Sequence, residues 1–306
     1  MIASITITTA DNSIATGRPT VAFTTPQNYA TRLSQLLTLK SLTPLWCPTI
    51  ITGPTPQILS SLALHLAPST ISSISAVVFP SRTAITAFST AIKSLATPLL
   101  PTKGDSFIVG ALGKDAELID TEFLLNFCSN IDRIRVLVPP TATPTGLVQL
   151  LGAGGGRRVL CLVPEVVGLE EPPVVPNFLR ELQASSWSPV RVDAYQTRWL
   201  GPSCAEEIVN RSEAKTEEGN GLDAVVFTSS AEVEGLLKSL NELGWDWETV
   251  RRRWPDLVVA AHGPVTAAGA ERLGVDVDVV SGRFGSFDGV VDALHVRLRG
   301  LGSKCM

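Results

Sequence analysis

The sequence predicts an α/β protein made of two similar lobes, each with a parallel β-sheet, and a cleft between them. Short runs rich in β-branched residues alternate with amphipathic segments of helix length, the pattern of α/β domains. The chain has 306 residues, of which 44% are apolar, so it is long enough for two cores. Two sequence landmarks also recur at nearly the same offset.

The recurring landmarks are a strand sequence and a glycine turn. The run Ala-Val-Val-Phe ends at Phe79 and again at Phe227, and the glycine turns follow at Gly113 and Gly263. The phenylalanines are 148 positions apart (227 − 79) and the glycines 150 (263 − 113). Two offsets that agree indicate a duplication. Two facing lobes form a cleft of the kind that small ligands occupy.

Each expected strand is a short β-branched run, and each expected helix is an amphipathic segment. The strands, in order, are 20–24, 76–79, 106–112, 134–138, 158–163, 190–195, 224–227, 257–261 and 277–281. The helices are 27–39, 56–66, 84–95, 114–127, 145–151, 176–184, 231–243, 246–253, 265–273 and 287–298. The charged segment 204–221 closes in Gly-Asn-Gly, so we expect its second half to be a solvated insertion loop.

Composition and charge indicate which kinds of partner the protein lacks and which compartment suits it. A net charge of −4 gives no basic patch for nucleic acid, and no apolar run is long enough for a membrane span. The five scattered cysteines contain no Cys-x-x-Cys pair, as is typical of reduced thiols. The first 18 residues are rich in Ser and Thr, as transit peptides are, but a flexible N-terminus over 1–17 is the favoured alternative. We expect a soluble monomer of the cytoplasm or a plastid.

Two other patterns argue against a nucleotide or metal site. The run Gly-Ala-Gly-Gly-Gly-Arg-Arg (152–158) precedes a strand, whereas a dinucleotide fingerprint follows one, so a turn is favoured. His65, His262 and His295 share no metal-ligand spacing with one another or with cysteine. His262 adjoins Gly263 at a strand end, which leaves either a ligand contact or a turn role.

Hydroxyl side chains follow both Ala-Val-Val-Phe strands: Ser81 after the first, and Thr228, Ser229 and Ser230 after the second. Ser229 stands three residues before Glu232, the spacing of a capping box, which explains the pattern without a ligand. Ligands of parallel sheets, however, bind at the carboxyl ends of strands, where helix N–H groups favour anions. A carboxylate-binding site is therefore the alternative.

Tyr195 ends a predicted strand and is one of only two tyrosines, the other being Tyr29. A strand-end phenol with an ordinary pKa of about 10 can donate a proton at neutral pH. Packing at a domain edge explains Tyr195 equally well.

Taken in order, these pieces resemble the uroporphyrinogen-III synthase family over nearly the whole chain from residue 20. The matching segments are 21–26 (Val-Ala-Phe-Thr-Thr-Pro), 77–81 (Val-Val-Phe-x-Ser), 111–118 (a Gly turn and helix), 193–197 (ending Tyr-Gln-Thr), 226–230 (Val-Phe-Thr-Ser-Ser), 263–267 (Gly-Pro-x-Thr-Ala) and 285–298 (a helix). The resemblance implies two α/β lobes joined by a pair of antiparallel strands. It places one lobe at 18–45 with 198–302, the other at 52–188, and the connecting strands at 46–51 and 190–197.

The resemblance also implies a cyclising hydro-lyase of heme and chlorophyll biosynthesis. Its substrate is the linear tetrapyrrole polycarboxylate hydroxymethylbilane, which it closes to uroporphyrinogen III with inversion of the last ring, using no metal or organic cofactor. Tyr195 is the implied catalytic residue. The implied substrate-binding residues are Ser81, Arg82, Thr83, Gly113, Thr228, Ser229, Ser230, Gly263 and Thr266.

The first lobe departs from the family pattern more than the second. Thr25 stands where the family has arginine, Pro80 where it prefers threonine, and 113–116 read Gly-Lys-Asp-Ala where Gly-x-x-Thr-Ala is usual. These differences leave a second hypothesis open, a relative that binds tetrapyrroles without converting them.

Overall fold

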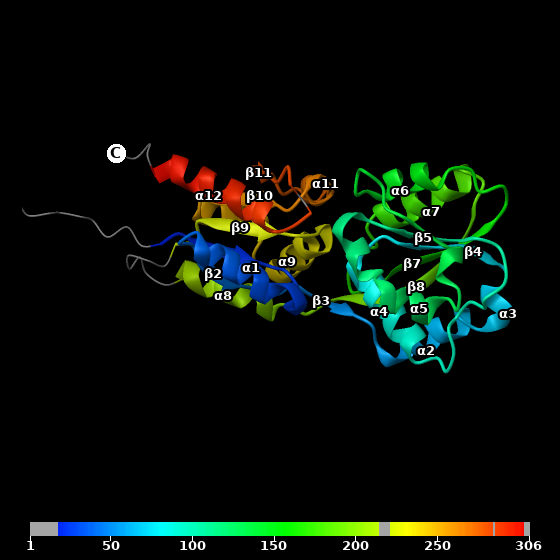
Figure 1. Cartoon of the computed structure of the whole chain (residues 1–306). Helices are drawn as coiled ribbons and strands as arrows, with labels where there is room; N and C mark the ends of the chain where they lie inside the picture. The colour runs from blue at the N-terminus through cyan, green and yellow to red at the C-terminus, as the bar shows by residue number, and fades with distance from the viewer. Residues whose placement is uncertain (1–17, 214–220, 284, 303–306) are drawn as a thin grey trace, which may run out of the picture.

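Two β-sheets with helices packed on them form the two ends of an elongated molecule (Figure 1). The structure is a computed structural model that describes residues 18–213, 221–283 and 285–302. The flexible N-terminus expected over 1–17 and most of the expected insertion loop lie outside the described residues.

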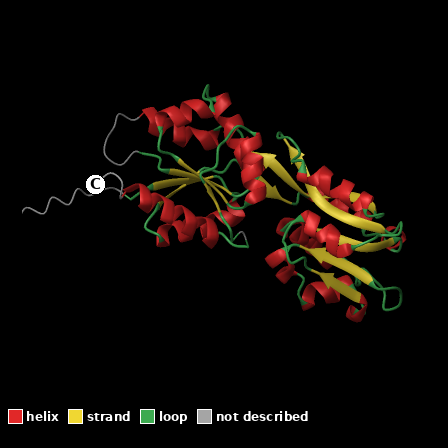
Figure 2. Cartoon of the chain, turned by 90° about the horizontal axis from the view of Figure 1, so that it is seen from above, coloured by secondary structure: helices red, strands yellow, loops and turns green. Residues whose placement is uncertain are grey.

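The five-stranded sheet joins the start of the chain to its last third. Its order is β11-β10-β9-β1-β2, and all its pairs are parallel. The strands are β1 (Thr20–Phe23), β2 (Thr43–Trp46), β9 (Ala224–Phe227), β10 (Val258–Ala261) and β11 (Val279–Val280). Helices cover both faces (Figure 2): α1 (Gln27–Leu39) and α12 (Asp288–Gly302) on one, and α8 (Ser203–Glu213), α9 (Ser230–Glu242), α10 (Trp247–Arg253) and α11 (Pro264–Arg272) on the other.

The six-stranded sheet is built from the middle of the chain in the order β3-β8-β7-β4-β5-β6, with β3 antiparallel to β8 and the other pairs parallel. The strands are β3 (Ile50–Gly53), β4 (Ile74–Phe79), β5 (Phe107–Ala111), β6 (Ile134–Leu137), β7 (Arg158–Val167) and β8 (Ser188–Trp199). One face carries α2 (Pro56–His65), α3 (Pro68–Ile71), α4 (Arg82–Lys93) and α5 (Thr121–Phe127), and the other carries α6 (Pro144–Leu151) and α7 (Val174–Ala184). Two short 3₁₀ helices, η1 (Gly113–Leu118) and η2 (Ile131–Arg133), complete this end.

Successive side chains of the central strands point to opposite faces, so each sheet has a hydrophobic core on both of its faces. Along β9, Val225 and Phe227 pack with α9, whereas Ala224 and Val226 pack on the α1 side. All four side chains are buried, which is why this strand reads as a continuous apolar run.

The predicted duplication is present in the topology of the sheets. The order β2-β1-β9-β10-β11 corresponds strand by strand to β8-β7-β4-β5-β6. The register also agrees, because Phe79 pairs with Ala111 on β5 and Phe227 with Ala261 on β10. Each landmark glycine lies two residues beyond that alanine. The two Ala-Val-Val-Phe strands therefore occupy equivalent places in two similar sheets.

The structure corrects three predicted elements. The helix expected at 114–127 is divided into η1 and α5, because the Asp120 carboxylate accepts from the Phe123 N–H at 2.8 Å and begins a new helix. The connecting strand expected at 46–51 begins later, since Trp46 pairs with Phe23 in β2 and β3 starts at Ile50. The first half of the charged segment after residue 203 is helix α8, which the sequence did not predict.

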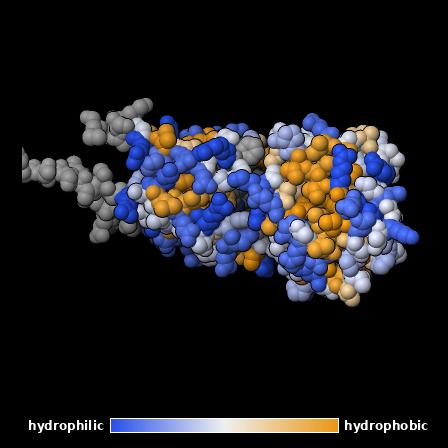
Figure 3. Space-filling view, viewed as in Figure 1, coloured by the Kyte–Doolittle hydropathy of each residue, from blue (hydrophilic) through white to orange (hydrophobic). Residues whose placement is uncertain are grey.

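The surface of the six-stranded end carries an apolar area in the view of Figure 3. Exposed apolar side chains at this end include Val136 on the edge strand β6, Val138 just beyond it and Leu150 on α6. The four-residue length of β6 limits its pairing with another chain. Across the described part of the chain, no helix has both the length and the apolar character needed to cross a membrane.

Candidate active site

Two helix N-terminal turns lie at the carboxyl ends of the equivalent strands. β4 leads into α4 through Ser81, and β9 leads into α9 through Ser229. Both serines are N-caps, since each hydroxyl accepts from the N–H three residues on, at 3.3 Å from Ala84 and 3.4 Å from Glu232. The predicted capping role of Ser229 is confirmed.

Tyr195 lies against the α4 turn. The Ser81 hydroxyl donates to its phenol oxygen at 2.9 Å, and only 8% of the Tyr195 surface is exposed. Burial raises the pKa of Tyr195 to about 12, although the Ser81 hydrogen bond opposes the rise. The phenol is therefore protonated at neutral pH. Because the hydrogen in the bond between the two residues comes from Ser81, the phenol hydrogen of Tyr195 remains available for another acceptor.

The first turn of α4 lies near the phenol of Tyr29, in the first turn of α1. Burial raises the pKa of Tyr29, and the nearby Thr83 hydroxyl opposes the rise. Nη1 of Arg82 lies 3.9 Å from Oδ1 of Asp115 in η1. Burial raises the pKa of Asp115, against the lowering effect of the Arg82 charge. Because Tyr29 and Thr83 follow β1 and β4, the carboxyl ends of the two sheets face each other.

A buried carboxylate fills the α9 turn. Glu232 is 1% exposed, and its Oε2 accepts from the Thr228 N–H and the Thr24 hydroxyl, each at 2.9 Å. Its Oε1 accepts from the Thr228 hydroxyl and, at 3.2 Å, from the Ser229 hydroxyl. Burial raises the pKa of Glu232, and these hydrogen bonds, those of Thr228 first, oppose the rise. The place that suits an anion at this helix N-terminus is thus taken by the chain's own side chain.

Further hydroxyls extend from this carboxylate. The Thr25 and Thr228 hydroxyls lie 3.1 Å apart, and the buried Thr266 hydroxyl donates to the Thr228 carbonyl at 3.1 Å. The Trp46 indole donates to the Thr25 carbonyl at 2.8 Å. Threonine side chains that follow β1 and β9, and one in the first turn of α11, therefore lie around the α9 turn.

Three predicted residues are placed mainly by backbone and packing. Gly113 begins η1 with a φ of +48°, in the left-handed region that favours glycine. Gly263 is the N-cap residue of α11 and has an extended backbone. Ser230 packs against Gly269 of α11, where an added Cβ would lie 2.4 Å from the Ser230 Cβ. Helices α9 and α11 can approach this closely because residue 269 is glycine.

The predicted residues therefore fall into two groups. The α4 group contains Ser81, Arg82, Thr83 and Tyr195, with Gly113 at the start of the next turn; the α9 group contains Thr228, Ser229, Ser230 and Thr266, with Gly263 at the neighbouring turn. The sequence did not predict the places of Tyr29, Thr24, Thr25 and Asp115 at these turns. One signal was available for Tyr29, since it is the other of the chain's two tyrosines.

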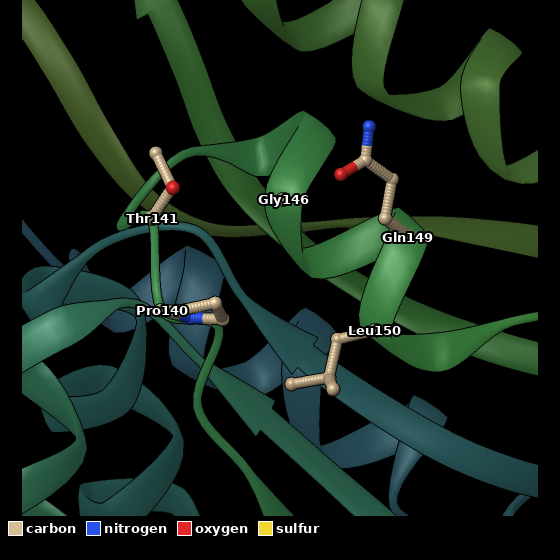
Figure 4. Close-up of a pocket in the computed structure, with 5 residues that line it drawn as sticks. All are labelled: Pro140, Thr141, Gly146, Gln149 and Leu150. Carbon is tan, nitrogen blue, oxygen red and sulfur yellow. The ribbon is translucent and has the colours of Figure 1, made fainter.

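A cavity of about 260 Å³ lies beside α6 and the turn that precedes it (Figure 4). It is lined by Pro140, Thr141, Gly146, Gln149 and Leu150, none of which is a predicted site residue. Within the described ranges, no group of three or more His, Cys, Asp or Glu side chains is arranged to hold a metal ion.

Comparison with known proteins identifies the family. A family model described as "Uroporphyrinogen-III synthase HemD" matches residues 31–290, which is most of the chain. The chain belongs to the uroporphyrinogen-III synthase family. No protein of curated function matches it in sequence.

Solved structures of the family share the fold. A mutant uroporphyrinogen III synthase from Thermus thermophilus is 18% identical with a TM-score of 0.57, over 93% of this chain and 99% of that one. The enzyme from Helicobacter pylori is 14% identical with a TM-score of 0.48, over 92% of this chain and all of the other (100%). The Thermus thermophilus structure shows that the two-sheet α/β architecture is that of a uroporphyrinogen III synthase.

Uroporphyrinogen-III synthases are cyclising hydro-lyases of porphyrin biosynthesis, and family membership supports this function for the chain. The family implies hydroxymethylbilane as the substrate.

Proposed function

We propose that the chain closes hydroxymethylbilane to uroporphyrinogen III and that Tyr195 is its catalytic residue. The supporting observation is the contact between Ser81 and Tyr195 at the carboxyl edge of the six-stranded sheet. Because Ser81 donates to the phenol oxygen, the phenol hydrogen is left for an oxygen of the substrate. The raised pKa of Tyr195 keeps it a donor through the neutral range.

The proposed chemistry needs one proton at the start. The terminal hydroxyl of the substrate leaves as water when Tyr195 supplies that proton, and an electrophilic azafulvene remains. The substituted carbon of the last ring attacks it, and the spiro intermediate breaks its bond to the neighbouring ring and recloses at the free carbon. That carbon then loses a proton, which restores the pyrrole and reprotonates the phenolate. The protein's main task is to hold a flexible chain in the inverting geometry.

We propose that substrate carboxylates bind first at the α4 turn. Helix α4 has no acidic residue in its own first turn; the acid near this turn is Asp115 of η1, 3.9 Å from the Arg82 guanidinium. The side chain of Arg82 is 45% exposed at the same turn. At the α9 turn, by contrast, Glu232 already accepts from Thr228 and Ser229. Of the α9 group, Ser230, Gly263 and Thr266 are the residues we propose for substrate contact.

The isomer assay tests the function. Spontaneous closure of hydroxymethylbilane gives isomer I, so we expect the protein to give isomer III in excess, with no added metal or cofactor. Tyr195→Phe should lower kcat for isomer III about 100-fold, the scale of one general acid. Circular dichroism and the urea midpoint should stay near those of the wild type. Saturable tetrapyrrole binding with isomer I as the only product would instead support a non-catalytic relative.

We further propose the domain limits, oligomeric state and compartment expected from the sequence. Strand membership supports one lobe at 18–45 with 198–302 and another at 52–188. Limited proteolysis should then cut first near the connections between them. Light scattering tests the proposed monomer, and imaging of a fluorescent fusion distinguishes the cytoplasm from a plastid.

A further inference from the structure

We propose that Arg191 is a positioning residue of the active site, because it braces a β-bulge at Ala194 that turns Tyr195 toward the α4 turn. This inference deepens the proposed function and rests on it. It starts from the ladder between β7 and β8, whose register passes over one residue of β8.

The bulge lies directly before Tyr195. In the parallel pair of β7 and β8, the partner of Val163 is Asp193. The partner of the next residue of β7, Pro164, is Tyr195, so Ala194 is an extra residue on β8. A proline fits opposite a bulge because it has no N–H to give to the ladder. Bulges are rare in parallel pairs, and next to active sites they serve to re-aim a side chain.

The extra residue places two consecutive side chains on one face of the sheet. Successive residues of a regular strand point to opposite faces. Val192, Ala194 and Tyr195, however, all pack in the hydrophobic core on the α4 face. Without the bulge, Tyr195 would point to the other face, away from the Ser81 hydroxyl that donates to its phenol oxygen at 2.9 Å. The bulge therefore brings the phenol to the α4 turn.

Arg191, three residues before Ala194, joins the two strands at the bulge. Its Nη2 donates to the Pro164 carbonyl of β7 at 3.3 Å. Its Nε and Nη2 each lie 3.1 Å from Oδ1 of Asp193, on its own strand. Its Nη1 lies 2.6 Å from Oε1 of Glu171, beyond the end of β7. One guanidinium thus ties β8 before the bulge to β7 opposite the bulge.

This brace is on the face of the sheet opposite Tyr195. Arg191 pairs in register with Cys161, whose side chain packs in the core on the α7 face. The Arg191 side chain is 38% exposed, so its replacement leaves the two cores filled. An effect of Arg191 on the reaction must therefore pass through the backbone of the bulge.

The substitution Arg191→Met removes the contacts of the guanidinium and keeps most of the aliphatic stem. Loss of the brace frees the bulge and displaces the phenol, and a displacement of about 1 Å can lower a rate about 100-fold. We expect a partial effect, with kcat for isomer III about tenfold lower and KM changed less than about twofold. Arg191→Lys keeps the charge without the planar fork, so it should recover only part of the loss.

Two comparisons show whether the effect acts through Tyr195. In the Tyr195→Phe background, Arg191→Met should cause no further loss of kcat, because the group that it positions is already gone. Arg158→Met is the matched control, since Arg158 begins β7 at the far end of the same ladder and its guanidinium donates to the Ser73 hydroxyl. It should leave kcat within about twofold. Equal losses in the two arginine variants, or an undiminished loss in the Tyr195→Phe background, would overturn the proposal.

Deletion of Ala194 tests the bulge directly. Every remaining pair of β7 and β8 keeps its present register after the deletion, so the strands beyond the bulge are not shifted. Tyr195 moves into the place of Ala194, which is fully buried (0% exposed) and has no room for a phenol. We expect kcat to fall about 100-fold. A folded deletion variant with wild-type kcat would contradict the role of the bulge, and if the shortened chain does not fold, Arg191→Met decides alone.

A second measurement separates this proposal from the proposed function. Urea denaturation of Ser81→Ala, Tyr195→Phe and the double variant measures how strongly the two hydroxyls are coupled. We expect this coupling in the wild type and in the Arg158→Met background, and its loss in the Arg191→Met background. The coupling does not depend on turnover, so the same result is expected if the wild type forms only isomer I. A coupling that survives Arg191→Met unchanged would refute the positioning role.

Discussion

The α4 and α9 turns begin alike and end in different chemistry. Each follows an Ala-Val-Val-Phe strand in the same register, and each starts with a serine N-cap. At the third helical position, α4 has Ala84 and α9 has Glu232. The carboxylate of Glu232 draws in the hydroxyls of its own turn, whereas the Ser81 hydroxyl is directed to Tyr195.

The sequence alone suggests that the α9 turn is the better preserved site. Compared with the family pattern, the α9 turn is intact and the α4 turn is altered. In the structure, the altered turn is the one that contacts Tyr195 and has an exposed arginine, Arg82. The intact turn holds the buried side chain of Glu232. The side chain at the third position, Glu232 in α9 and Ala84 in α4, therefore decides whether the helix supplies a carboxyl group to its own N-terminus.

Of the changes that test the difference between the two turns, Glu232→Ala should have the largest effect on stability. The change leaves the Thr24 hydroxyl, the Thr228 N–H and hydroxyl and the Ser229 hydroxyl without their buried acceptor. We expect the free energy of unfolding to fall by about 3 kcal/mol, given the cost of unsatisfied buried donors. Urea denaturation measures it.

Glu232→Gln is the control for Glu232→Ala, because the amide keeps one acceptor oxygen and most of the volume. Its loss should be clearly smaller. Equal losses for the two variants would mean that the side-chain oxygens of Glu232 contribute little to stability and that packing of the chain explains its burial.

Replacing the two N-cap serines should have a smaller effect on stability, equal for both, but different effects on activity. Ser81→Ala and Ser229→Ala each remove a cap, so each should cost about 1 kcal/mol of stability in urea denaturation. Their activities should differ, since only Ser81 contacts Tyr195. We expect Ser81→Ala to lower kcat for isomer III about tenfold, the scale of one lost hydrogen bond, and Ser229→Ala to leave it within about twofold. A larger loss of kcat in Ser229→Ala would place the reacting groups at the α9 turn instead.

The sequence was sufficient for the lobes and insufficient for the site. Continuous apolar strands and agreeing offsets predicted two parallel sheets, and the spacing of Ser229 and Glu232 predicted the cap. Strand β2 was missed because Thr-Pro-Leu-Trp lacks a β-branched run, and α8 because its charged sequence resembles a loop. The contact of Ser81 with Tyr195 joins residues 114 positions apart, and no local pattern encodes it.

The smallest predicted effect is a dependence of stability on pH that originates at the α9 turn. Burial raises the pKa of Glu232 above its ordinary value of 4.5, so the folded protein binds this proton more tightly than the unfolded chain does. The stability from this group is fully present below pH 4.5 and is lost as pH rises through the folded pKa. The free energy of unfolding of the wild type, minus that of Glu232→Gln, should therefore fall as pH rises above 4.5, with a slope of at most about 1.4 kcal/mol per pH unit. Urea titrations at several pH values measure this difference, and Ala84→Gln at the equivalent position of α4 should show no such slope against the wild type. A difference that rises with pH would mean that the hydrogen bonds from Thr228, Thr24 and Ser229 outweigh burial, so that the α9 turn holds a stabilised carboxylate anion.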